Sequence, residues 1–215
     1  MTCIILSFAE YLSEINFVFM AISALPEPLQ SGYEIHEWRH ASAILALDFP
    51  EELADICDVL GRFRLCKTFL TSLGGRKSQV SQGIDSAFYT KGWVEKKFDT
   101  AFVVDNTSIA SPTHAVDCYK NKVALEIEWN NKDPFFDRDL NNFRLLFELR
   151  VISVGVIVTR CDSLQDIFDR LDRGSSFGAS TTHMSKLLPK VEGGGGGGCP
   201  VLVFGIKDTL YDENC

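Results

Sequence analysis

The sequence has no excess of basic residues, although its length and composition are those of a folded protein. Its 29 Asp and Glu outnumber 21 Lys and Arg, which gives the 215 residues a formal net charge of −8. Repulsion from phosphate slows an encounter with nucleic acid, so the average charge argues against a protein coated with DNA. Hydrophobic residues make up 46% and charged residues 23%, which excludes general disorder, a fibrous repeat and a membrane bundle. At this length we expect one domain.

The chain also has no closely spaced cysteine pair of the kind that a zinc knuckle or a redox motif requires. Its seven cysteines are scattered along the sequence. An odd number in a chain too large to need covalent crosslinks predicts reduced thiols in a reducing compartment. We therefore expect a cytoplasmic protein.

No apolar run near the N-terminus reaches the length of a membrane span. Residues 15–25 are strongly apolar but far shorter than the ~20 residues that a span needs. No Lys or Arg precedes them, and Glu10 and Glu14 stand where a signal peptide has its positive region. We expect a short apolar element or a loosely attached extension, which Pro26 and Gly32 separate from the rest of the chain.

Beyond this extension, helical and strand patterns alternate. Pro50 is followed by two acidic residues and by apolar residues at helical spacing, which is typical of a helix start. Helices are predicted over residues 50–60, 79–88, 135–149 and 163–171. Strands are predicted over residues 98–104, 115–119, 123–129, 151–159 and 199–206. This interleaving predicts an α/β domain with a mixed central β-sheet flanked by helices.

Six consecutive glycines at 193–198 predict a flexible connector, because glycine restricts the backbone least. The segment has no following Lys-Ser/Thr at the start of a helix, so it does not predict a phosphate-binding loop.

The most informative stretch is a predicted hairpin whose turn is centred on Asn121 and Lys122. In that register Asp117 lies directly opposite Glu126, and Glu128 shares their face because strand side chains alternate. A different turn register would move Asp117 away from the facing position.

Three carboxylates on one face of a hairpin repel each other unless a positive charge compensates them. A divalent cation with oxygen ligands does so, and Mg²⁺ is commonly held by one or two carboxylates together with a substrate phosphate. The other interpretation is a solvated acidic stripe that Lys120 and Lys122 neutralise. The spacing alone leaves both interpretations open.

An Asp, eight intervening residues, a Glu, one apolar residue and a further acidic residue, all on a hairpin, resemble the catalytic core of type II restriction endonucleases. The similarity is to the BglII/BstYI group, which is BamHI-like and belongs to the PD-(D/E)xK nuclease superfamily. It spans residues 33–159 and includes the Gly92-Trp93 pair and the aromatic segment 129–136, with an echo at 200–206. The Lys of many nucleases is missing, and Glu128 takes its place, where the BglII and BstYI pattern has Gln and the BamHI pattern has Glu.

The resemblance implies that Asp117 and Glu126 hold Mg²⁺ and that the backbone carbonyl of Ile127 completes the protein ligands. Glu128 then orients or deprotonates the attacking water, or serves as a third ligand. The implied reaction is hydrolysis of double-stranded DNA to 5′-phosphate and 3′-hydroxyl ends by a homodimer, at a palindrome with a GATC core. The endonuclease domain is expected at 33–215, with 1–32 as an extension, and a start at Met20 or later is expected to give an active protein.

The acidic average conceals a basic segment. Residues 1–61 carry one basic and ten acidic residues, whereas residues 62–99 carry eight basic and three acidic residues. A basic segment just before the acidic site is what a phosphate-contacting arm requires. The residues predicted to contact DNA are Arg76, Lys77, Ser78, Lys132 and Arg138. The other interpretation of residues 74–78 is an exposed basic loop, and Arg138 could equally pair with the neighbours of Asp137 on its helix.

Three further interpretations concern the polar residues and the class of protein. His114 and His183 have no partner pattern, so we interpret both as structural. The polar loop 175–182 is of the kind that reads bases. A structure-specific repair or phage nuclease and a non-catalytic DNA-binding module with a decayed site are the alternative functions.

Overall fold

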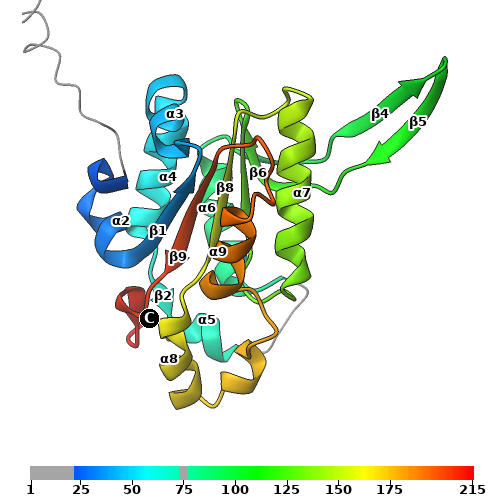
Figure 1. Cartoon of the computed structure of the whole chain (residues 1–215). Coiled ribbons are helices and arrows are strands. Elements are labelled where there is room, and N and C mark those ends of the chain that lie inside the picture. The colour runs from blue at the N-terminus through cyan, green and yellow to red at the C-terminus, as the bar shows by residue number, and fades with distance from the viewer. Residues whose placement is uncertain (1–21, 73–76) are drawn as a thin grey trace, which may run out of the picture.

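Six strands form the central sheet, in the order β1-β9-β8-β7-β6-β3 (Figure 1). The computed structural model describes residues 22–72 and 77–215. β7, β8 and β9 run parallel to one another, whereas β1, β6 and β3 pair antiparallel with their neighbours, so the sheet is mixed. The strands are β1 (Tyr33–Trp38), β3 (Val94–Lys96), β6 (Val116–Lys120), β7 (Val123–Ile127), β8 (Val154–Arg160) and β9 (Val201–Ile206).

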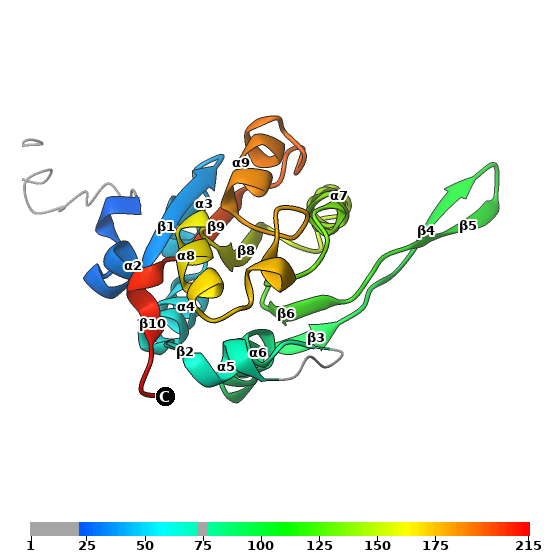
Figure 2. The same ribbon diagram turned by 90° about the horizontal axis from the view of Figure 1, so that it is seen from below.

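Helices cover both faces of this sheet, which confirms the predicted α/β architecture (Figure 2). One face packs on α4 and α6, and the other packs on α7 and α9. In β8, Val156 and Val158 join the first core and Ile157 joins the second, as the two-residue period of a strand requires. The main helices are α3 (Ala41–Asp48), α4 (Pro50–Arg62), α6 (Gln79–Thr90), α7 (Pro134–Glu148) and α9 (Met184–Glu192).

Shorter helical segments join the main elements. They are η1 (Ile22–Ala24), α2 (Glu27–Gly32), α5 (Lys67–Thr71), η2 (Asp162–Leu164), α8 (Gln165–Arg170), η3 (Gly174–Phe177) and η4 (Asp208–Leu210). Within residues 22–72 and 77–215, no helix has the length and apolar character needed to cross a membrane.

The β6–β7 hairpin has the turn predicted from the sequence. Asn121 and Lys122 have φ values of 42° and 68°, as a two-residue type I′ turn requires. The ladder pairs Cys118 with Leu125, so the next pair toward the open end of the hairpin is Asp117 with Glu126. The predicted register is therefore confirmed.

The segment predicted as a strand over 98–104 lies outside the central sheet. β4 (Asp99–Val104) pairs with β5 (Thr107–Pro112) in a two-stranded ladder of its own. This hairpin, which we call the arm, projects from the body between β3 and β6 (Figures 1 and 2). Its apolar side chains are exposed, with Val103 72% exposed. The strand pattern predicted the local conformation but not the partner, and β5 was not predicted.

Residues 22–32 pack on the core, so the expected extension over 1–32 is not separate along its whole length. Leu29 of α2 is 0% exposed. A Cβ on Gly32 would lie 2.8 Å from Leu210, so the end of α2 packs closely on η4. Leu25, just before α2, and Leu29 within it are both buried in the same core cluster. Residues 1–21, Met20 among them, lie outside the described residues.

The glycine segment 193–198 forms a hydrogen-bonded turn against α7 and is not the flexible connector that was predicted. The N–H of Gly195 donates to the carbonyl of Lys190 at 2.8 Å. Gly197 has a φ of +60°, and a Cβ there would lie 2.7 Å from the side chain of Arg144. Close packing against the neighbouring helix therefore both requires glycine and orders the segment.

Cys66 and Cys215 form a disulfide, so the prediction that all cysteines are reduced is wrong. β2 (Leu65–Cys66) pairs in parallel with β10 (Tyr211–Asp212), which brings the C-terminal residue beside Cys66 with a Cα separation of 5.0 Å. The two cysteines are 149 residues apart in sequence, and spacing along the chain does not reveal such a contact. The expected cytoplasmic location thereby loses the argument that supported it.

Candidate active site

Asp117 and Glu126 lie side by side at the open end of the β6–β7 hairpin. The N–H of Asp117 donates to Oε2 of Glu126 at 3.3 Å, and the N–H of Ile127 donates to Oδ2 of Asp117 at 3.0 Å. Glu126 is 1% exposed, whereas Asp117 is partly exposed. The two backbone donors therefore fix a buried carboxylate next to one that solvent reaches.

Glu128 follows β7 but stays tied to the sheet. Its N–H donates to the carbonyl of Val158 at 2.9 Å, and its carbonyl accepts from Oγ1 of Thr159 at 2.7 Å. The side-chain amide of Asn131 donates to Oε2 of Glu128 at 2.7 Å. Glu128 is 1% exposed, so its backbone is fixed to β8 while Asn131 holds its buried carboxyl group at the end of the strand.

His114 and Asp139 join this cluster, although His114 was predicted to be structural and Asp139 was not among the predicted site residues. Nε2 of His114 lies 3.3 Å from Oε1 of Glu126 and 3.1 Å from Oδ1 of Asp139. Asp139 is 0% exposed on the buried face of α7, between Phe136 and Leu140 of the apolar stripe. An acidic residue inside such a stripe was the signal that could have identified it.

Arg138, which the sequence argument assigned to DNA, pairs with two of the carboxylates. Its guanidinium lies 3.2 Å from Oε1 of Glu128 and 2.8 Å from Oδ1 of Asp139. It also stacks over the ring of Phe135, with 4.3 Å between the guanidinium carbon and the ring centroid. These contacts place Arg138 beside the hairpin carboxylates, where it compensates part of their charge.

The cluster changes the proton affinity of its members. Burial raises the pKa of Glu126 to about 8 and that of Glu128 to about 10, and the charge of Asp139 adds to both shifts. Burial disfavours the charged form of His114, but its hydrogen bonds to Asp139 and Glu126 outweigh that effect and raise its pKa to about 9. The carboxylates are thus crowded enough that additional positive charge stabilises their ionised form.

The donor set fits a divalent cation. The ligand atoms of His114, Glu126 and Asp139 all lie within 4.8 Å of one another. Oδ2 of Asp139 is buried and has no hydrogen-bond partner. Carboxylate oxygens with an imidazole nitrogen suit a small divalent ion. Glu126 belongs both to this group and to the pair with Asp117 that the resemblance implies, so it is central to either arrangement.

The start of α6 supplies the opposite side of the site. Lys77 forms an ion pair with the buried Asp85, and its Nζ lies 3.5 Å from Oδ1 of Asp117. Ser78, predicted to contact DNA, is the N-cap of α6, and its Oγ accepts from the N–H of Ser81 at 3.0 Å. Arg76, the other predicted contact in this segment, lies outside the described residues.

A cleft of about 390 Å³ opens between these elements. The hairpin and the residue after it contribute Asp117, Ile127 and Glu128 to the lining. Ile127, whose carbonyl was predicted to be a metal ligand, therefore also borders the cleft. The first turns of α6 and α7 both border this space, which favours anions because helix N-termini carry partial positive charge. From these helices and the loop before α7 the lining includes Lys77, Ser78, Gln79, Asn130, Asn131, Phe135 and Arg138.

Lys132 follows Asn131, which lines the cleft, and contacts the polar loop 175–182. It forms an isolated bridge with Thr181, and its Nζ lies 3.4 Å from Oγ of Ser180. The buried guanidinium of Arg160 donates to Oγ1 of Thr181 at 2.8 Å. The contact with Arg160 therefore fixes the later part of this loop. Thr182 is buried and unavailable to a base.

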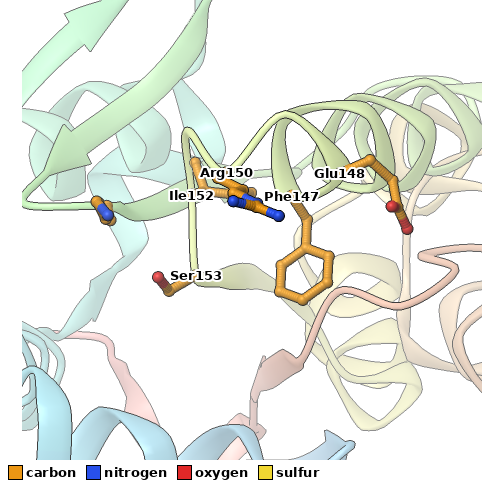
Figure 3. Close-up of a pocket in the computed structure, with 6 residues that line it drawn as sticks. Phe147, Glu148, Arg150, Ile152 and Ser153 are labelled. Atoms are coloured by element: carbon orange, nitrogen blue, oxygen red, sulfur yellow. The ribbon is translucent and has the colours of Figure 1, made fainter.

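A second pocket, of about 340 Å³, lies at the other end of β7 near the hairpin turn. Figure 3 shows it where α7 ends and the chain turns toward β8. Its lining contains a single carboxylate, that of Glu148, beside Lys122 and Arg150. Without an acidic cluster it has none of the metal-binding chemistry of the first cleft.

Comparison with known proteins identifies a family for this chain. No curated protein matches the chain. The family model described as restriction endonuclease BglII/BglIII matches residues 33–206, which includes the hairpin, α7 and all six strands of the central sheet from β1 to β9. The chain therefore belongs to the BglII/BglIII family of restriction endonucleases.

Proposed function

We propose that the protein is a Mg²⁺-dependent type II restriction endonuclease that cuts both strands of a palindromic DNA site as a homodimer. Membership of the family makes it a sequence-specific DNA endonuclease. The observation that carries the finer proposal is the gathering of Asp117, Glu126 and Glu128 at one end of the hairpin beside an open cleft.

Asp117, Glu126 and the carbonyl of Ile127 would hold the metal ion, with His114 and Asp139 bordering it. When bound, Mg²⁺ neutralises the crowded carboxylates and polarises the scissile phosphate. The backbone donors of Asp117 and Ile127 orient the two carboxylates, so the ligand geometry is set before substrate arrives.

Glu128 takes the proton of the attacking water. Asn131 and the two backbone contacts of Glu128 orient its carboxyl group, and Arg138 favours the ionised form that accepts a proton. The water oxygen bonds to phosphorus as its proton passes to Glu128. The bond from phosphorus to the 3′-oxygen breaks, and that oxygen takes a proton from solvent, leaving 5′-phosphate and 3′-hydroxyl ends.

Two copies of the site are needed to cut two strands of a palindrome, which supports the homodimer. The resemblance suggests a site with a GATC core. We also propose that the protein acts in the cytoplasm, where a restriction enzyme encounters incoming DNA. Arg138 lines the cleft, and Lys132 follows the lining residue Asn131. Both are proposed phosphate contacts, as are Lys77 and the segment at Arg76.

The test is digestion of plasmid and phage DNA with Mg²⁺ or with EDTA. Discrete fragments with common ends, seen only with Mg²⁺, are expected. Glu126→Ala should abolish cutting, whereas Asp137→Asn, which removes an exposed carboxylate of α7 paired with Lys190, should not. Cutting of branched DNA alone would indicate a structure-specific nuclease. DNA binding without any cutting would indicate a decayed site.

A further inference from the structure

The open end of the β6–β7 hairpin offers carboxylates but no ammonium group to the substrate, because its two lysines, Lys120 and Lys122, lie at the turn. Glu128 stands at the strand position that carries a Lys in many related nucleases. Among the described residues that line the cleft, the cations are Lys77, Arg138 and Arg173. Arg138 is already paired with Glu128 and Asp139. Lys77 is the cation beside Asp117, which lies at the open end of the β6–β7 hairpin.

Lys77 reaches the site from a different element, the start of α6. Its Nζ lies 3.5 Å from Oδ1 of Asp117, and the side chain is 39% exposed, so one side of the ammonium group faces the cleft. It is therefore close enough to contact a phosphate bound beside Asp117.

The position of Lys77 is fixed by buried contacts. Its ion-pair partner Asp85 lies two turns further along α6, with a side chain that is 3% exposed. Sγ of Cys118 donates to Oδ1 of Asp85 at 3.7 Å, and the hydroxyl of Tyr89 donates to the carbonyl of Asp117 at 3.1 Å. These contacts tie α6 to β6, so Lys77 is held against the catalytic strand and is not a free surface cation.

We propose that Lys77 is a catalytic residue that contacts a non-bridging oxygen of the scissile phosphate and supplies the positive charge that the hairpin lacks. This inference rests on the proposed nuclease function. Negative charge grows on the phosphoryl oxygens as the water oxygen bonds to phosphorus and the bond to the 3′-oxygen breaks. The ammonium group stabilises that charge and keeps its proton throughout, so proton transfer still runs from water to Glu128. Asp85 acts as a positioning residue through Lys77.

The test separates the rate of cleavage from DNA binding. Lys77→Met is compared with Lys77→Arg and with Lys190→Met. The last variant removes a lysine of α9 that pairs with Asp137 of α7. Single-turnover cleavage with Mg²⁺ gives the rate of the chemical step at saturating enzyme. Fluorescence anisotropy with Ca²⁺ in place of Mg²⁺ gives the dissociation constant for the same DNA.

Lys77→Met is expected to slow single-turnover cleavage by about 10²-fold or more while DNA affinity falls by less than about tenfold. Lys77→Arg should recover part of the rate, and Lys190→Met should cleave as the unaltered protein does. A normal rate for Lys77→Met, or a loss of affinity that accounts for the whole loss of cleavage, would overturn the proposal.

Two further measurements keep the test decisive. Removing Lys77 leaves Asp85 buried without its cation, so the double variant Lys77→Met/Asp85→Asn is tested if the single variant does not fold by circular dichroism. It should fold and show the same slow cleavage. If the unaltered protein cuts no DNA, the proposed function itself fails; if it cuts and the folded Lys77 variants cut equally fast, only the role of Lys77 fails.

Discussion

Glu128 shows how one buried side chain links stability to chemistry. Its carboxyl is 1% exposed, and burial together with the charge of Asp139 raises its pKa to about 10. A carboxyl whose pKa is higher in the folded state than in the unfolded state binds more protons when folded. Its contribution to stability therefore decreases as the pH rises from the unfolded pKa of about 4.3 toward 10.

Glu128→Gln should therefore stabilise the protein in EDTA at pH 9, by on the order of 2 kcal/mol, and have little effect at pH 4. An amide keeps the shape of the protonated acid and carries no charge to desolvate. Thermal unfolding of both proteins across this pH range measures the difference. Asp137→Asn is the control, since Asp137 is exposed; a pH-independent difference for Glu128→Gln would contradict the expectation.

The contacts of His114 and Asp139 with Glu126 could not be predicted from the sequence. The spacing of Asp117, Glu126 and Glu128 follows from the period of a strand and a two-residue turn, so the sequence predicted that they meet. His114 lies before β6 and Asp139 lies on α7. Their contact with Glu126 depends on how α7 packs on the sheet, which no local pattern along the chain encodes.

Among the elements, α2 illustrates how a segment that was expected to be an appendage stabilises the core. Its Leu29 is completely buried against α4, and a Cβ at Gly61 would lie 3.5 Å from it. Leu47, on α3, is 79% exposed and has the same side chain. The two leucines therefore form a matched pair that differs in burial.

Leu29→Ala should lower the free energy of unfolding by about 2–5 kcal/mol, because it removes buried methyl groups and leaves a cavity. Leu47→Ala should change it by no more than about 0.5 kcal/mol. Urea denaturation followed by tryptophan fluorescence measures both. Equal effects of the two substitutions would show that α2 does not belong to the folded core.

The arm is an element that lies outside both hydrophobic cores. β4 and β5 pair only with each other, and Phe102, Val103 and Ile109 are exposed. Asp99 pairs with Pro112 at the base, so a short linker can join residues 98 and 113. Replacing 99–112 with four Gly and Ser residues should change the free energy of unfolding by less than about 1 kcal/mol.

The same denaturation experiment checks the arm variant, with Phe143→Ala as the contrasting core substitution. Phe143 is completely buried, and its ring occupies the space that a Cβ on Gly155 would need. Phe143→Ala should lower the free energy of unfolding by about 3–5 kcal/mol. A comparable loss on removing the arm would mean that the arm supports the sheet.

For the whole molecule, the disulfide between Cys66 and Cys215 closes a loop of 149 residues. A crosslink of this length restricts the unfolded chain strongly. Cys215→Ser should therefore cost about 2–5 kcal/mol of stability. Cys57→Ser, which alters a free and half-buried thiol, is the control. Addition of a reductant should abolish the difference between Cys215→Ser and the unaltered protein; a difference that persists would exclude the crosslink as its cause.

The net charge of −8 also changes meaning in the folded molecule. As an average it argues against a DNA partner, but ten of the acidic residues precede residue 62. Others, Glu126, Glu128 and Asp139 among them, are buried in the candidate active site and present little charge to an approaching duplex. The average charge is therefore a poor guide to the charge of the surface that would meet DNA.

The chain alone specified the elements that depend on local spacing. Periodicity and turn chemistry predict the helix start at Pro50, the apolar stripe of α7, the Asn121-Lys122 turn and the resulting register of the acidic hairpin. The tertiary structure decided the contacts between distant segments: His114 and Asp139 at Glu126, Lys77 at Asp117, the arm outside the sheet, and Cys66 beside Cys215. These contacts depend on how helices and strands pack across the whole domain, because burial brings together residues that no short-range pattern relates.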